Sequence, residues 1–136
     1  VQYGLPNLRC KNIIFSGVHY EMLFMRKSDK KIDNQIRDVL TDVCEDTLKG
    51  YDGFLWVTHT VNFSSFPQSL KIVGVFDTNQ DRTHFLESGG QQEVATVIQN
   101  AFNQVGIKLK NADKHISYDT QENCERDHQG KWNLRL

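Results

Sequence analysis

The chain has 136 residues, a length that fits one domain and leaves little room for two separate cores. Hydrophobic residues make up 38% and charged residues 24% of the chain, so it can bury a core and is not of the disordered class. The formal net charge of -1 argues against a broad nucleic-acid-binding surface, although it leaves room for a local basic patch.

The N-terminal quarter of the chain contains an arm, a strand and the start of a helix. Residues 1–10 contain Gly4 and Pro6 and show no periodicity, so we expect a surface arm. Residues 11–26 alternate in polarity and predict a long strand that bends at Gly17. Residues 28–31 predict a polar turn, and residues 32–48 predict an amphipathic helix, because the apolar residues recur at helical spacing. They are Ile32, Ile36, Val39, Leu40, Val43, Cys44 and Leu48.

Residues 53–78 predict a central β-hairpin. The run 54–63 alternates, so Leu55, Val57 and His59 lie on one face while Phe54 and Trp56 lie on the other. The run 70–76 is rich in β-branched residues and predicts the second strand. The connection 64–69 contains a proline, which cannot donate to a ladder, and predicts a turn.

The C-terminal half predicts a helix between short elements. Residues 81–86 suggest one helical turn, and 94–105 predict a second amphipathic helix. Residues 115–120 predict a late strand, and 120–130 read as a polar loop. Within the segment 121–136, Trp132, Leu134 and Leu136 alternate, which favours an edge strand at the tail.

The order of these elements predicts one α+β domain over residues 1–136. Strand, helix, two strands, helix and strand follow the split βαβ pattern of a ferredoxin-like sandwich. In that arrangement an antiparallel sheet carries two helices on one face. The fold by itself does not specify a function.

The second face of the sheet gives the leading functional expectation. Phe54, Trp56, Val73 and Val75 are apolar, and two helices on one side would leave them uncovered. An exposed apolar patch of this kind marks an interface or a ligand groove. We therefore expect a homodimer packed through this face, or a small apolar ligand bound there, with Trp56 near the centre.

The main alternative is an enzyme with His59 as a general base. His59 lies on the apolar face of the hairpin, where a core histidine bonded to a partner is the simpler interpretation. A cavity with Asp77 or Asp119 nearby would make it a catalytic base. Binding of single-stranded nucleic acid through Trp56 or Tyr20 is a third, less favoured class, because the composition supplies no basic surround.

The remaining motifs do not predict a metal or a cofactor. Asp77, Asn79 and Asp81 resemble the start of a calcium loop, but the sixth position is not glycine and the twelfth is not glutamate. A turn that caps the next helix explains them better. Cys124 and His128 lie close in sequence without the further ligands that a metal site needs.

Cysteine usage and hydropathy predict the compartment. Cys10, Cys44 and Cys124 are odd in number and widely spaced, so we expect no disulfide framework and a reducing environment. Cys44 then acts as a small core residue. No run reaches the ~18 apolar residues of a membrane span, and no signal peptide is visible. These features predict a cytoplasmic protein that does not associate with membranes.

One resemblance concerns the hairpin. The segments FSSFPQSL and KIVGVFDTN, residues 63–79, are similar to segments of small bacterial proteins without an assigned function. Such proteins occur as conserved hypothetical proteins and as products of mobile gene cassettes. The resemblance implies a bacterial cytoplasmic origin and implies no site residue.

Overall fold

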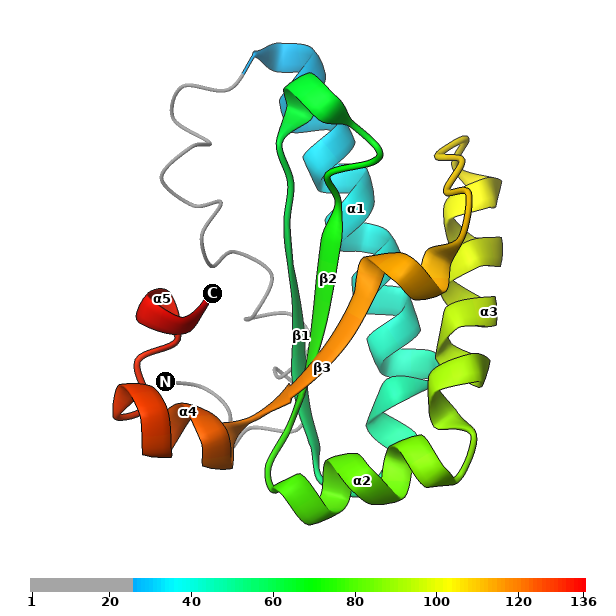
Figure 1. Ribbon diagram of the computed structural model, residues 1–136. Helices are drawn as coiled ribbons and strands as arrows, with labels where there is room; N and C mark the ends of the chain where they lie inside the picture. Colours follow the sequence, from blue (N-terminus) through cyan, green and yellow to red (C-terminus); the bar gives the residue numbers. More distant parts are fainter. Residues whose placement is uncertain (1–25) are drawn as a thin grey trace.

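A computed structural model describes residues 26–136 of the chain (Figure 1). The predicted arm at 1–10 and nearly all of the predicted strand at 11–26 lie outside the described residues. The described helices are α1 (Lys27–Asp46), α2 (Asn79–Glu87), α3 (Gly90–Gln104), α4 (Gln121–His128) and α5 (Trp132–Arg135). The strands are β1 (Phe54–Thr60), β2 (Lys71–Phe76) and β3 (Ile116–Thr120), and single 3-10 turns cover Leu48–Gly50, Phe63–Ser65 and Ala112–His115.

The three described strands form one mixed sheet in the order β1-β2-β3. β1 and β2 pair antiparallel as the predicted hairpin, which confirms the α+β class. β2 and β3 are direct neighbours and run parallel, with α2 and α3 between them in the chain. The expected antiparallel, ferredoxin-like sheet is therefore wrong at this pair, because a split βαβ unit holds another strand between its two parallel strands.

A β-bulge near the start of β1 decides which side chains share a face. Phe54 is paired with Phe76 and Trp56 with Val75, so β1 carries one residue more than β2 between these pairs. Because neighbours along β2 point to opposite faces, Phe54 and Trp56 also lie on opposite faces. The prediction that these two side chains share a face is wrong for this reason.

Helices α1, α2 and α3 pack on the face of the sheet that carries Phe54 and Phe76 (Figure 1). The predicted stripe of α1 is confirmed, since Ile36, Leu40 and Val43 are buried. The predicted polar turn at 28–31 is wrong, because α1 already begins at Lys27. On α3 the corresponding buried residues are Val94, Ile98 and Phe102. Along the part of the chain that the structure describes, no helix combines the length and hydropathy needed to cross a membrane.

The tail of the chain is helical and lies on the opposite side of the sheet (Figure 1). The Thr120 side chain accepts a hydrogen bond from the backbone N–H of Asn123 and caps α4, so the predicted polar loop is wrong. The predicted edge strand at 132–136 is also wrong, because Trp132 begins the short helix α5. Only Trp132 of the alternating tail residues is buried, while Leu134 is 60% exposed.

Candidate functional site

His59 lies in the core and is held by an acid that the sequence reading had not singled out. Its Nε2 is 2.8 Å from Oδ1 of Asp33 on α1, and both side chains are fully buried. The second carboxylate oxygen of Asp33 accepts from Nε of Arg37 at 3.0 Å. The network ties α1 to β1, as expected for a core histidine bonded to a partner.

The structure does not bring the two predicted catalytic residues together. His59 is paired with Ile72 at the start of β2, whereas Asp77 follows the end of that strand, roughly 16 Å away along the chain direction. Asp77 is exposed, and its backbone N–H donates to the carbonyl of Gly53 at 2.8 Å. A general base that pairs His59 with Asp77 therefore has no geometric support.

The four predicted interface residues are covered by their own chain. Phe54 and Trp56 are each 2% exposed, Val75 is fully buried and Val73 is half-buried. The Trp56 ring meets Trp132 of α5 edge to face, with the ring centroids 4.9 Å apart. The expectation of an uncovered apolar face is wrong, because a helical tail lies where only a strand or loop had been foreseen.

A cluster of charges fixes the tail over this face. Arg135 donates from Nε and one terminal nitrogen to the two oxygens of Asp119 at 2.6 and 3.0 Å, and from the other terminal nitrogen to Asp127 at 3.2 Å. Asp127 also accepts two bonds from Arg126. These two guanidinium groups lower the pKa of the Asp127 carboxyl well below its usual range. Arg135 therefore ties α5 to Asp119 of β3 and to Asp127 of α4, and the cluster acts as a structural clamp.

The ends of the two parallel strands, where α/β sheets commonly bind ligands, are occupied by the protein itself. The Glu122 carboxylate accepts from the backbone N–H of Asn79 at the start of α2, at 2.9 Å. The Asn79 side chain bonds with Thr120 and Asn123. Thr78 caps α2 by accepting from the N–H of Asp81. The turn that resembles the start of a calcium loop therefore caps α2, which is the interpretation that the sequence favoured.

A polar groove of about 580 Å³ lies beside α3. One wall is the outer face of α3, and the other is the segment that returns from α3 toward β3. Side-chain amides dominate the lining, which contains a single charged group, Asp113. The lining residues are Leu86, Gly89, Gln91, Gln92, Ala95, Thr96, Gln99, Asn100, Asn111, Ala112 and Asp113.

Gln99 holds the two walls of this groove together. Its side-chain nitrogen donates to the carbonyl of Leu109 at 2.7 Å, and its oxygen accepts from the N–H of Ala112 at 2.9 Å. Gln91 adds a bond to the Asp113 carboxylate at 3.2 Å. The side chain of Asn100 has no hydrogen-bond partner among the described residues and is exposed in the groove.

A second cavity, of about 500 Å³, lies on the outer side of α2. Asp52, Asp81, His84 and Glu87 line it together with neutral polar residues. Within residues 26–136, no group of three His, Cys, Asp or Glu side chains has the spacing to hold a metal ion. This cavity has acidic walls and no preformed ligand set.

The cysteines differ from the predicted set of free thiols. Cys44 is disulfide-bonded, so the expectation that it acts as an unpaired core residue is wrong. Cys124 is a free thiol that is fully buried, and burial raises its pKa. A protonated, inaccessible thiol is a poor nucleophile.

The groove beside α3 was missed by sequence reasoning, although its polar side chains fall on one helical face at Gln92, Thr96, Gln99 and Asn100. Asp33 could have been found, since it lies three residues before Ile36 and seven before Leu40, on the buried stripe. Comparison of the chain with protein-family models, curated proteins and solved structures found no match.

Proposed function

We propose that this chain is a small-ligand-binding domain and that its ligand lies in the groove beside α3. The observation that carries the proposal is a cavity of about 580 Å³ between two walls that are joined by hydrogen bonds. Ligand sites in proteins usually fall within about 300–1,000 Å³ and are largely formed before the ligand arrives.

The lining favours a neutral, polar ligand. Side-chain amides such as those of Gln92 and Asn100 each offer a carbonyl acceptor and two N–H donors. A ligand with hydroxyl or amide groups matches such walls, and a saccharide or a short peptide has both. The apolar ligand expected from the sequence matches this groove poorly, because its methyl groups would leave those amides without partners.

The Gln99 bridge supports binding by keeping the groove open. Its amide spans from Leu109 to Ala112 and copies the bonding of a backbone peptide unit. A wall fixed in this way loses little conformational freedom when a ligand binds, which preserves affinity.

Self-association stays a prediction, but the surface first assigned to it does not support it. Three of the four predicted interface residues are buried within the chain, and Val73 is half-buried. A homodimer would have to use another face, and light scattering at high protein concentration would detect it.

An enzyme based on His59 would need substrate access to a fully buried imidazole. A cytoplasmic, bacterial origin is also a proposal, and the disulfide at Cys44 counts against a reducing compartment.

The side-chain amide signals of Asn and Gln in a ¹⁵N-labelled sample provide the test. We expect glucose, N-acetylglucosamine or glycylglycine at millimolar concentration to shift the Asn100 and Gln92 amide signals. Asn100→Ala should weaken that response, while Asn103→Ala should keep it, because Asn103 is exposed on α3 outside the groove. If no neutral saccharide or peptide shifts any groove amide, the proposed function is wrong.

A further inference from the structure

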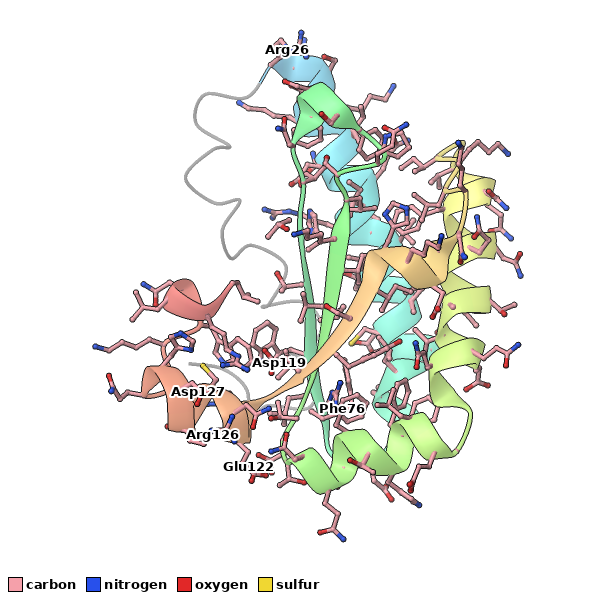
Figure 2. All side chains as sticks on the ribbon, viewed as in Figure 1. Arg26, Phe76, Asp119, Glu122, Arg126 and Asp127 are labelled. Carbon is pink, nitrogen blue, oxygen red and sulfur yellow. The ribbon has the colours of Figure 1, made fainter. Side chains whose placement is uncertain are left out.

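The start of α1 carries an unusual concentration of positive charge. Lys27, Lys30 and Lys31 are all exposed and lie within the first turns of the helix. They follow Arg26, which is labelled in Figure 2. Arg26 pairs with Asp29 at 3.2 Å. The three lysines have no carboxylate partner among the described residues.

Two more exposed lysines lie at the same end of the sheet. The buried contact between Asp33 and His59 places the start of α1 beside the end of β1. Lys71 is paired with Thr60, the residue that follows His59. His115, next to Lys114, bonds through Nδ1 to the carbonyl of Leu70, the residue before Lys71, at 2.7 Å.

We call these five residues the basic edge: Lys27, Lys30, Lys31, Lys71 and Lys114. Acidic groups gather at the opposite end of the strands, where Asp52, Asp77 and Glu122 lie. Figure 2 shows Arg26 and Glu122 at opposite ends of the molecule. The near-neutral total charge of the chain is therefore compatible with this local concentration of lysines.

The charges of α1 run against the helix dipole. Cations near a helix N-terminus are unfavourable, and Lys27 repels Lys30 and Lys31 at helical spacings of three and four residues. The last turn of α1 has no basic residue and ends in Glu45 and Asp46. Neither arrangement helps the helix to form, so folding does not account for the lysines.

We propose that the basic edge binds the phosphodiester backbone of a nucleic acid without sequence preference. Lysines on flexible stems act as point charges that neutralise phosphates and release counterions. Five of them along one edge suit an extended polyanion better than one small anion. A membrane surface is less favoured, because none of the large exposed apolar residues that the structure describes belongs to this edge: Leu134 and Leu136 lie in the tail, and Val105 follows α3.

Fluorescence anisotropy with a labelled random-sequence DNA duplex of about 20 base pairs tests the proposal across a range of salt concentrations. We expect binding at low salt that weakens steeply as salt rises. The double variant Lys30→Gln/Lys31→Gln should weaken binding about tenfold or more and make the slope of log K against log salt shallower by about two. Lys71→Gln/Lys114→Gln should act in the same way from the strand side of the edge.

The matched control is Lys49→Gln/Lys131→Gln, which removes two exposed lysines from other parts of the surface. It should bind like the parent chain. Thermal melting separates lost binding from lost folding, since Lys30→Gln/Lys31→Gln should melt no lower than the parent. The proposal is overturned if DNA does not bind at low salt, if the control variant loses as much affinity as the edge variants, or if only phosphatidylserine vesicles bind.

Discussion

Replacing Asp33 with alanine should destabilise the protein strongly, because it removes the carboxylate that is hydrogen-bonded to the fully buried imidazole of His59. His59 is fully buried, and a buried donor without a partner costs about 1–3 kcal/mol. The bond from Arg37 to Asp33 is also lost, and because Arg37 is 26% exposed this term adds less than about 1 kcal/mol.

The expected loss in the free energy of unfolding for Asp33→Ala is therefore about 3 kcal/mol. This value lies at the lower end of the range for a broken buried ion pair, about 3–5 kcal/mol. For a chain of 136 residues, 3 kcal/mol corresponds to a fall in Tm of about 10 °C.

Urea unfolding followed by tryptophan fluorescence measures this loss, and a double-mutant cycle assigns it to the pair. His59→Leu alone leaves a buried carboxylate oxygen without its imidazole donor, so it should also destabilise the protein. The double variant should cost at least about 1 kcal/mol less than the sum of the two single variants. Asp38→Ala, at an exposed acid on the same helix, should change stability by less than about 0.5 kcal/mol.

Two results would refute this reasoning. A loss below about 1 kcal/mol for Asp33→Ala would mean that water or another group satisfies His59. Strict additivity of Asp33→Ala and His59→Leu would mean that the 2.8 Å contact carries no interaction energy.

Three further predictions follow from the packing. Trp132→Ala should lower the free energy of unfolding by about 3 kcal/mol. Trp56 is then the sole tryptophan, and its fluorescence emission should move to longer wavelength. Unchanged emission would mean that the tail does not cover Trp56. Burial raises the pKa of both Tyr118 and Cys124 above their ordinary values of 10.0 and 9.0, so the unfolded chain releases these protons first. The free energy of unfolding should thus hold below about pH 9 and fall as the pH rises further, which urea midpoints at several pH values will show. A thiol reagent applied to the unreduced, denatured chain should label the peptide of Cys124 but not that of Cys44, and prior reduction should expose Cys44 to labelling.

The helices and the hairpin could be predicted because their information is local. Periodicity locates α1 and α3, since the buried residues from Ile36 to Cys44 and from Val94 to Phe102 repeat at helical spacing. Period-two patterning and a proline-containing turn likewise locate β1 and β2.

The errors concern choices that local patterns do not encode. The extra residue between Phe54 and Trp56 could not be read from a run in which both faces are apolar, because either alternation fits. The parallel pairing of β2 with β3 depends on contacts between residues more than 40 positions apart, such as Gly74 and Tyr118. Gly74 fits there because a Cβ atom at that position would lie 3.0 Å from the Tyr118 ring.

The tail shows how a short pattern can favour the wrong element. Trp132, Leu134 and Leu136 alternate as they would in a strand, but five residues are too few to separate a period of two from one turn of helix. The deciding interactions come from elsewhere in the chain. Asp119 holds Arg135, and Gln121 accepts from the Trp132 indole N–H at 2.9 Å.

Two features of α1 break the usual rules for a surface helix, and the difference between them separates structure from function. Asp33 places an acid on the buried stripe, yet His59 and Arg37 satisfy both of its oxygens, so folding accounts for it. Lys27, Lys30 and Lys31 oppose the helix dipole, and no acidic partner among the described residues compensates for them. Natural sequences depart from local rules mainly where function requires it. We therefore expect a large loss of stability when Asp33 is mutated. Mutation of the three lysines should instead weaken binding and leave stability unchanged.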